Sequence, residues 1–325
     1  MQRDLIGYGR YLPKVVWPHS ARLALNFVLN YEEGSESNVL DGDDHSEGYL
    51  TDLPGALALK DQRHLSVESH FEYGSRVGVW RLLRLFDEHH IPLTIFATGL
   101  ALERNPALAD FLKGSHHEIA GHGYRWIDYR SVGESFERAH MQKTIEVIQS
   151  LSQKKVVGWY TGRRSMHTRQ LAVEAGLRYD SDSYADDLPY WVKVSQRAHL
   201  IIPYQLDTND ARYAMLPGWN SGEDFFHYLK ASFECLHREG AQSPKMMTIG
   251  LHARFSGRPG RCEALYRFIK YVVQFDDVWI CRREDIANHW YVHAPVTIKE
   301  DCDAPIFDQK NAGNRSSNGC ELGSE

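Results

Sequence analysis

The feature of this sequence that most constrains its fold is a regular alternation of short apolar runs with segments of helical periodicity. The first apolar run starts at Leu23 and ends at Tyr31, and further runs typical of buried strands occupy residues 92–99, 117–121, 156–161, 178–182, 200–203, 246–252 and 278–281. Apolar residues at helical spacing predict helices over residues 74–90, 105–113, 133–151, 168–175, 223–239, 262–274 and on to 290. Such alternation favours parallel strands joined by crossover helices. About seven strands in this order predict a closed or nearly closed (β/α) barrel rather than an open sheet, although periodicity alone does not separate the two.

The chain is long enough to bury one large core. Of its 325 residues 42% are hydrophobic, and barrels of this length form one domain. We therefore predict a single catalytic domain over residues 1–296. Beyond about residue 297 the sequence turns to Lys, Asp, Asn, Ser and Gly, so residues 297–325 are predicted to be a disordered tail without a function.

Charge and cysteine usage exclude several classes of protein. The 37 Lys and Arg and 43 Asp and Glu give a net charge of −6, and no basic run is interleaved with aromatics, so nucleic acid is not an expected partner. No apolar segment is long enough to span a bilayer, and no apolar region follows the N-terminus as in an export signal. The five cysteines are far apart and form no Cys-x-x-Cys, which argues against a disulfide framework or a thiolate zinc site. These features together predict a cytoplasmic protein.

A long polar segment follows the first strand. Residues 34–66 are acidic and exceed the usual length of a connection in a compact domain, so we expect a functional lid, a disordered loop or an arm between subunits. The cluster from Asp41 to Asp44 superficially resembles a calcium loop. It lacks the glutamate at the twelfth position and the flanking helices, which favours a solvated loop.

Chemically useful side chains recur at the ends of the predicted strands. Glu32 and Glu33 end the first strand, and later strand ends are followed by His122, Arg163, Asp182 and His252. A lone histidine among 17 is usually a packed or surface residue. In parallel sheets, however, active sites collect at the carboxyl ends of strands, so these side chains are expected to converge.

These residues lie in stretches that resemble the polysaccharide deacetylase (NodB-homology) superfamily, and within it the allantoinase branch. The resemblance runs from Arg3 to about Trp290 and includes Val28–Gly34, Glu72–Arg76, His122–Tyr129, Gly158–Arg163, Asp180–Trp191 and Leu206–Asp210. In the deacetylases of this superfamily, a Thr-Phe-Asp-Asp motif supplies a base and a metal-binding aspartate, and a His-x-x-x-His motif supplies two more ligands.

The resemblance implies an altered metal site in this chain. Glu32 matches the base, Glu33 the metal-binding carboxylate and His122 the first histidine, whereas Trp126 stands at the second histidine. A catalytic zinc ion normally has three protein ligands, and an indole offers only an N–H donor. The allantoinase branch is known for this loss, so we expect no cofactor and no metal, with Glu33, His122 and Trp126 as vestigial ligand positions.

The activity implied by the resemblance is hydrolysis of the cyclic amide of allantoin to allantoate, in purine catabolism. We assign Glu32, with Glu33, as the base, His252 as the acid, and Arg163 as the group that orients the acidic residues or stabilises the oxyanion. His122 and Trp126 are expected to shape the pocket. Further substrate-binding candidates are Asp182 and Asp207, which either bind the ureido nitrogens or orient Arg163 and the loops, and Glu68.

Three other functions stay open from the sequence. A metal-dependent polysaccharide deacetylase would need a third ligand from elsewhere in the chain. A cyclic imide hydrolase would act on nearly the same electrophile. A small-molecule binding protein without catalysis would keep the pocket but would not need Glu32. Relatives of the allantoinase branch look oligomeric, so a homo-oligomer is expected as well.

Overall fold

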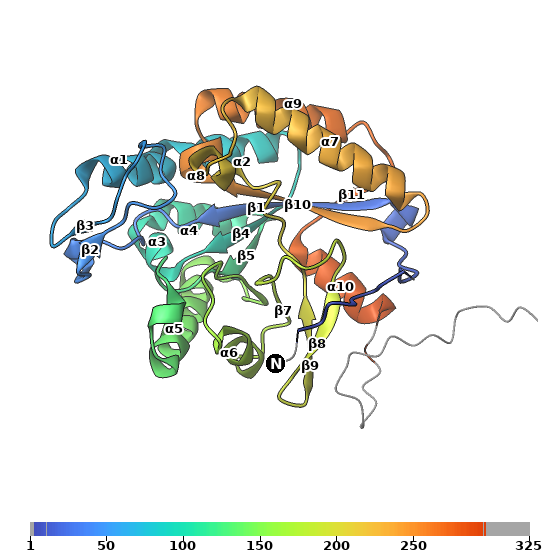
Figure 1. Ribbon diagram of the computed structural model, residues 1–325, viewed down its shortest axis with the longest axis horizontal. Helices are drawn as coiled ribbons and strands as arrows, with labels where there is room; N and C mark the ends of the chain where they lie inside the picture. The colour runs from blue at the N-terminus through green and yellow to red at the C-terminus, as the bar shows by residue number, and fades with distance from the viewer. Residues whose placement is uncertain (1–2, 11, 295, 297–325) are drawn as a thin grey trace, which may run out of the picture.

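The computed structural model describes residues 3–10, 12–294 and 296. The predicted tail of residues 297–325 lies outside them. The strands of the main sheet follow the order β10-β1-β4-β5-β6-β7-β9-β8, and β11 also pairs with β1. Except for the antiparallel pair β8 and β9, all of these pairings are parallel. The mostly parallel sheet confirms the predicted α/β fold of the (β/α) barrel type (Figure 1).

The strands of the main sheet are short, apart from two long neighbouring ones. The long strands are β1 (Leu23–Tyr31) and β10 (Lys245–His252), and every residue of both is buried. The others are β4 (Leu93–Ala97), β5 (Glu118–Gly121), β6 (Gly158–Trp159), β7 (Tyr179–Asp180), β8 (Tyr190–Val194), β9 (Arg197–Ile201) and β11 (Val278–Ile280). Between β9 and β10 the ring is completed by a single parallel bridge from Asn209 to Gly250. The barrel is therefore nearly closed.

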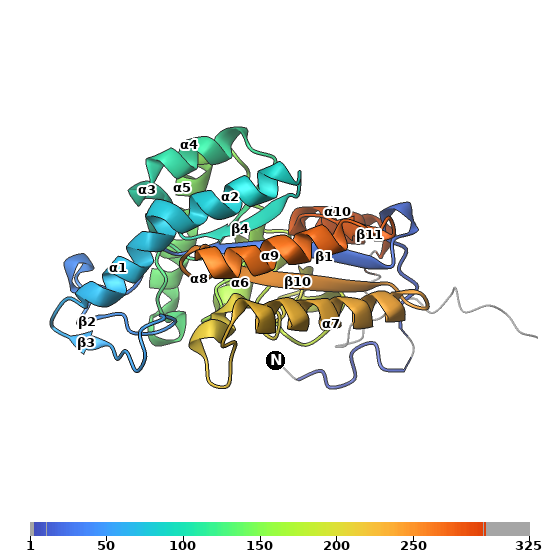
Figure 2. The same ribbon diagram turned by 90° about the horizontal axis from the view of Figure 1, so that it is seen from above.

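Helices cover the outside of the barrel. In Figures 1 and 2, α7 and α9 lie together along β1 and β10, while α5 and α6 lie beside β5 and β7. The α-helices are α1 (Leu65–Tyr73), α2 (Val79–Glu88), α3 (Gly99–Arg104), α4 (Pro106–Gly114), α5 (Glu134–Ser152), α6 (Thr168–Glu174), α7 (Gly222–Gly240), α8 (Ala253–Ser256), α9 (Pro259–Val272) and α10 (Arg283–His293). A π-helical turn, η3 (Gly74–Gly78), joins α1 to α2, and 3-10 turns span Pro18–Ser20, Val39–Asp41, Tyr129–Ser131 and Asp210–Ala214.

Helix α2 illustrates how the apolar pattern places a helix. Its buried face is formed by Val79, Leu82, Leu83, Leu85 and Phe86, which follow the three- and four-residue spacing of one helical face. Phe86 meets Phe27 of β1 edge to face, with ring centroids 5.1 Å apart. Among the described residues, no helix has both the length and the apolar character that crossing a membrane requires.

The interior of the barrel is filled in layers beneath the carboxyl ends of the strands. Side chains on alternate positions of β1 face inward, so Asn26, Val28 and Asn30 lead up to Glu32. At the lowest of these layers the fully buried Arg283 donates hydrogen bonds to Oδ1 of Asn26 and to Oγ1 of Thr248, both at 2.9 Å. The barrel is thus a packed core, and the chemistry is confined to its upper end.

Several elements of the structure were not predicted, among them the short helices α3 and α8. Strand β8 was not predicted, and it forms an antiparallel hairpin with β9 through Ser195 and Gln196. The segment of residues 34–66 is not structureless, because it contains a 3-10 turn (Val39–Asp41) and a small hairpin of β2 (His45–Ser46) and β3 (Leu59–Lys60), and α1 begins at its end. This hairpin and α1 project from one side of the barrel (Figures 1 and 2).

Candidate functional site

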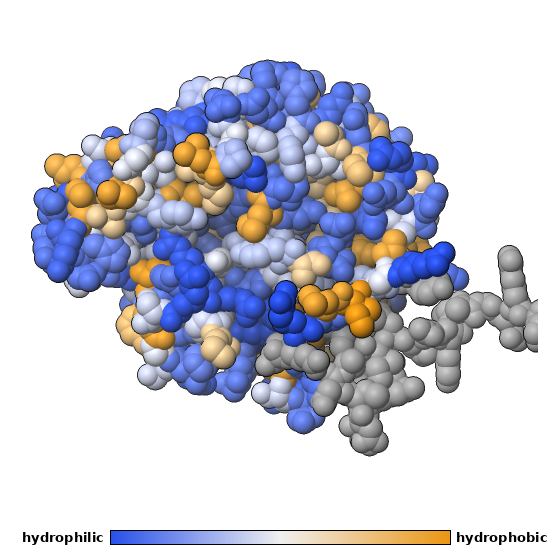
Figure 3. All heavy atoms as spheres, in the orientation of Figure 1, coloured by the Kyte–Doolittle hydropathy of each residue, from blue (hydrophilic) through white to orange (hydrophobic). Residues whose placement is uncertain are grey.

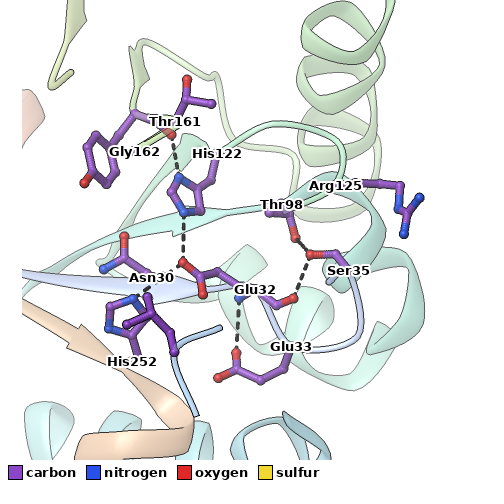
Figure 4. A network of polar contacts seen from close by, with 12 residues as sticks. Asn30, Glu32, Glu33, Ser35, Thr98, His122, Arg125, Thr161, Gly162 and His252 are labelled. Carbon is purple, nitrogen blue, oxygen red and sulfur yellow. Dashed lines mark hydrogen bonds and ion pairs between the residues drawn. The ribbon is translucent and has the colours of Figure 1, made fainter. Parts of the chain in front are cut away.

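The site is built around Glu32, which follows the last residue of β1. Its side chain is only 2% exposed, as expected for a residue that the inward-facing side of a central strand delivers to the barrel mouth. Glu33 is equally buried, and its Oε2 accepts the backbone N–H of Glu32 at 3.1 Å (Figure 4), while its Oε1 lies against Gly74 at the start of η3. A Cβ atom added at Gly74 would lie 2.5 Å from Oε1 of Glu33, so only a glycine fits there. The two carboxylates therefore have different surroundings.

Two buried histidines converge on Glu32. Nε2 of His122, which follows β5, lies 3.1 Å from Oε1 of Glu32 (Figure 4). Nε2 of His252, the last residue of β10, lies 3.5 Å from the same oxygen. Nδ1 of His122 donates to the backbone carbonyl of Tyr160, which fixes the orientation of the ring. The predicted convergence of strand ends thus brings Glu32, His122 and His252 into one cluster.

His252 is held from behind by Asp210, the first residue of the 3-10 turn Asp210–Ala214. Nδ1 of His252 donates to Oδ1 of Asp210 at 2.7 Å. The other carboxylate oxygen accepts the backbone N–H of His252 at 2.8 Å and the hydroxyl of Ser256 at 2.6 Å. Asp210 is completely buried, so this carboxylate orients the imidazole and leaves Nε2 directed at Glu32.

A buried guanidinium completes the cluster. Arg254, two residues beyond His252, is fully buried, and its Nη2 lies 2.8 Å from Oε2 of Glu32. Its Nη1 lies 3.5 Å from Oε1 of Glu33, whose Oε1 also accepts the backbone N–H of Arg254 at 3.1 Å. Within the described residues, neither Oε2 of Glu32 nor either Nη atom has an aligned hydrogen-bond partner. The contact between Glu32 and Arg254 is therefore a buried ion pair without an aligned hydrogen bond.

The protonation states follow from these contacts. Burial alone would raise the pKa of Glu32, but the charges of Arg254 and His252 and the hydrogen bond from His122 hold it well below its usual value. Burial alone would lower the pKa of His252, but Glu32 and Asp210 raise it to about 9. Burial also raises the pKa of Glu33, and the charge of Glu32 adds to this effect. At neutral pH Glu32 is therefore a carboxylate and His252 a protonated acid.

The residues at the vestigial metal positions do not fit a catalytic zinc ion. The indole of Trp126 has no lone pair to offer, and Nε2 of His122 is directed at Glu32 rather than at Glu33. The guanidinium of Arg254 lies beside Glu33, where its charge opposes a second cation. Two potential ligands and an adjacent fixed cation are a poor site for a divalent metal.

Among the described residues, one group is close enough in space to hold a metal ion: Asp87, His116 and His117. Both histidines precede β5 and so lie at the opposite end of that strand from His122. Nδ1 of His117 accepts the backbone N–H of Leu93 at 3.1 Å, which puts the ring proton on Nε2. Nε2 carries the ring proton and lies 3.4 Å from Asp87 without an aligned hydrogen bond, so in this tautomer His117 has no free lone pair for a metal ion.

Arg163 lies in the wall of the site and not beside the carboxylates. Its guanidinium carbon is 4.0 Å from the ring centroid of Trp126 and 4.9 Å from that of Tyr49. Nη1 of Arg163 also lies 3.6 Å from Oε2 of Glu47. Because Glu47 and Tyr49 belong to the 34–66 segment, Arg163 fastens that segment to Trp126.

The segment of residues 34–66 is tied to the barrel at further points. Arg125 pairs with Asp43 through Nη1 at 2.8 Å, and Arg104 pairs with Asp41. The backbone carbonyl of Leu50 accepts a hydrogen bond from Nε of Arg254 at 3.1 Å. The segment therefore packs against the site within this one chain, and it supplies one of the contacts that hold Arg254.

The other three predicted residues lie outside the cluster. Asp182 is buried but accepts the backbone N–H groups of Thr161 and Gly162, and burial together with the charge of Asp180 raises its pKa to about 6. Asp207 is exposed and accepts a hydrogen bond from the hydroxyl of Tyr228 at 3.2 Å. Glu68 pairs with Arg63 at the start of α1. Of these residues, Asp182 acts on the loop that carries Arg163, which is one of the two roles expected for it.

Two residues of the cluster were missed by the sequence analysis: Asp210 and Arg254. Asp210 stands three residues after Asp207, in the stretch Leu206–Asp210 that resembles the family. The preceding Asn209 caps the 3-10 turn by accepting the N–H of Ala211. Such an Asn-Asp pair is a turn signal that could have separated Asp210 from Asp207. Arg254 follows His252 by two residues, a spacing that keeps both near one strand end.

The chain is similar to known proteins in sequence and in fold. The family model for polysaccharide deacetylase matches residues 60–179. A Schizosaccharomyces pombe protein named "Putative polysaccharide deacetylase" is 39% identical over 314 residues, which cover 90% of this chain and 98% of that protein.

Two solved structures are similar to this chain over most of its length. The crystal structure of PuuE allantoinase is 50% identical with a TM-score of 0.89, and the match covers 91% of this chain and 99% of that one. The structure named "probable Polysaccharide deacetylase" from Pseudomonas aeruginosa PAO1 is 52% identical, also with a TM-score of 0.89, over 91% of this chain and 100% of that one. With a nearly full-length relative and two similar structures, the chain belongs to the polysaccharide deacetylase family, whose members are hydrolases of carbon–nitrogen bonds.

Proposed function

We propose that this protein is an allantoinase, which opens the cyclic amide of allantoin to allantoate without a metal ion and so serves purine catabolism. The observation that carries the proposal is the pairing of an ionised Glu32 with a protonated His252, whose Nε2 lies 3.5 Å from Oε1 of Glu32. Both groups start in the protonation state that amide hydrolysis requires. The similarity to PuuE allantoinase supports this choice of substrate.

The proposed reaction balances with these two residues. Glu32 takes a proton from water as the water oxygen bonds to the amide carbon, and the carbonyl oxygen becomes an oxyanion. When the oxyanion collapses, the carbon–nitrogen bond breaks and the leaving ring nitrogen takes a proton from His252. The proton on Glu32 then passes to His252 across their short separation, which restores the starting state. The new carboxylic acid loses its own proton to solvent.

Asp210 and His122 support this cycle without entering the bond changes. Asp210 holds Nδ1 of His252 and stabilises the imidazolium, so that Nε2 can deliver its proton. His122 contacts Oε1 of Glu32, whereas Oε2 lies 2.8 Å from Nη2 of Arg254 without an aligned hydrogen bond. Glu33 contacts Arg254 rather than the histidines, so Glu32 is the better candidate for the base.

Two other substrates compete with allantoin. The deacetylase-named structure is as similar to this chain as PuuE is, which favours an N-acetylated sugar; the metal-dependent form of that reaction conflicts with the donor set at Glu33, His122 and Trp126. A cyclic imide presents nearly the same planar electrophile as allantoin. A protein that binds such a ring without turning it over would not need the acid and base states of Glu32 and His252.

The test is turnover by the purified protein of racemic allantoin, succinimide and a chitin oligosaccharide, each with and without a chelator. We expect allantoate from allantoin, with unchanged rate in the chelator. Turnover of succinimide but not allantoin would make the protein an imide hydrolase. Release of acetate that stops in the chelator would make it a metal-dependent deacetylase. Heat-stabilisation by allantoin without any product would identify a binding protein.

A further inference from the structure

Arg254 directs its two buried Nη groups at the carboxylates of the site, Glu32 and Glu33. Its side chain is fully buried, and Nε is fixed by the carbonyl oxygen of Leu50 at 3.1 Å. The two Nη atoms lack aligned acceptors within the described residues, although carboxylate oxygens of Glu32 and Glu33 lie nearby. Leaving buried N–H groups without aligned acceptors costs stability, so their retention points to a ligand.

The guanidinium occupies a particular place among the vestigial metal positions. It is 3.5 Å from Glu33 through Nη1, and its central carbon is 5.2 Å from the ring centroid of Trp126. Glu33 and Trp126 are two of the three positions at which the related deacetylases hold their metal. The ring of Phe71, with its centroid 4.3 Å from the guanidinium carbon, closes the other side. A fixed positive charge thus lies beside two of the three vestigial metal positions.

We propose that Arg254 replaces the catalytic metal ion, and that its Nη1 and Nη2 groups donate to the carbonyl oxygen of a planar cyclic ureide and to the oxyanion that forms from it. The proposal rests on the function proposed above and assigns the oxyanion-stabilising role to Arg254 in place of Arg163. In that reaction Glu32 and His252 move the protons, and Arg254 keeps its own.

The chemistry of arginine suits this role. A guanidinium stays protonated in proteins, so its charge is permanent, and a chelator has nothing to remove. Two N–H groups on one planar fork can converge on a single oxygen as negative charge develops there. Lysine would bring the charge but not the fork, because an ammonium is a point charge on a flexible stem.

Arg163 differs from Arg254 in each of these respects. Arg163 is partly exposed and stacks on the ring of Trp126, and its charge is matched by Glu47 of the 34–66 segment. The contacts of Arg163 are with Glu47, Tyr49 and Trp126 rather than with Glu32, Glu33 or His252. Arg254 contacts both carboxylates, which makes it the cation that a substrate bound at Glu32 would meet.

The kinetic test compares Arg254→Met and Arg254→Lys with the matched control Arg258→Met, which removes an arginine four residues further on that stacks on Tyr73 and precedes α9. We expect kcat on allantoin to fall at least about 10²-fold in Arg254→Met, the usual scale for one oxyanion donor, and to stay near wild type in Arg258→Met. Arg254→Lys keeps the charge, so its kcat should fall less than that of Arg254→Met. Added guanidinium ion should restore part of the kcat of Arg254→Ala and none of that of Glu32→Gln. A kcat for a folded Arg254→Met within about threefold of wild type would overturn the proposal.

A second test needs no substrate and is therefore independent of the proposed function. It compares zinc bound after dialysis in Trp126→His with zinc bound in the double variant Trp126→His and Arg254→Ala. If Arg254 stands in the place of the metal, only the double variant should bind about one zinc per chain, because the single variant keeps a competing cation. Equal zinc in the two variants would contradict the assignment. If the wild-type protein leaves allantoin intact, the substrate proposal fails while this measurement still decides the role of Arg254.

Discussion

Replacing Asp210 with asparagine tests the acid at the centre of the proposed reaction. Asp210 uses both oxygens: Oδ1 accepts from Nδ1 of His252, and Oδ2 accepts the backbone N–H of His252 and both the N–H and the hydroxyl of Ser256. An asparagine has one acceptor oxygen. We expect this oxygen to take the position of Oδ2, which accepts from three donors. Its NH₂ group then faces Nδ1 of His252, where it can only donate. The imidazole must accept that hydrogen bond and becomes neutral.

The size of the effect follows from the pKa of His252. Burial lowers this pKa, while Glu32 and Asp210 raise it to about 9, so removing the charge of Asp210 moves it down. If it falls to the ordinary value of about 6.5, the protonated fraction at pH 8 drops from about 0.9 to about 0.03, so kcat/KM there should fall roughly 30-fold. The direction of the shift is fixed. Asp210 raises the pKa of His252, so without the charge of Asp210 the imidazolium loses its proton at a lower pH.

The assay is the pH dependence of kcat/KM on allantoin, together with NMR titration of the His252 ring, which needs no turnover. In the wild type we expect the alkaline limb near pH 9, and in Asp210→Asn a limb shifted to lower pH. The matched control is Asp207→Asn, the same chemical change at an exposed carboxylate three residues earlier, which should leave both curves in place. An alkaline limb that stays near pH 9 in a folded Asp210→Asn protein would refute the assignment of His252 as the acid.

Further substitutions test the base and the packing beside the site. Glu32→Gln keeps the size of the side chain but cannot accept a proton from water, and His252→Ala removes the acid, so each should lower kcat by about 10²-fold or more with folding intact by circular dichroism. A near-normal kcat in Glu32→Gln would mean that Glu32 is not the base, and in His252→Ala that His252 is not the acid. Gly121→Ala puts a Cβ atom 2.2 Å from the ring of Trp159, so the free energy of unfolding should fall by about 1–3 kcal/mol in chemical denaturation. An unchanged denaturation midpoint would show that Trp159 moves aside without cost.

The barrel and the core of the site could be predicted because both depend on local periodicity. The apolar run of β1 is buried at each of its nine positions, so its end was visible as the change from Tyr31 to Glu32. His122 and His252 were found in the same way, each at the last residue of an apolar strand or just beyond it. Parallel strands bring such ends together without any knowledge of loops.

The residues that escaped prediction depend on loop geometry or on pairing across the chain. Asp210 lies in a 3-10 turn after an irregular stretch, and nothing in its periodicity distinguishes it from the exposed Asp207. Strand β8 was missed because its hairpin turns through Ser195 and Gln196, whose φ angles are 45° and 68°. Glycine or asparagine normally marks such a turn, and here neither is present. Ion pairs between distant segments, such as Arg163 with Glu47, leave no local pattern at all.

Trp126 links the departure from the family's metal site to the arginines around it. An imidazole at this position would serve a metal ion, and a metal ion would repel the neighbouring guanidinium of Arg254. An indole instead presents an aromatic face to two guanidinium groups, Arg163 at 4.0 Å and Arg254 at 5.2 Å from its centroid. The same substitution therefore removes a metal ligand and favours a permanent cation next to Glu32 and Glu33. If Arg254 replaces the metal ion as proposed, the loss of a metal ligand and the presence of a fixed cation have one physical cause, the aromatic face of Trp126.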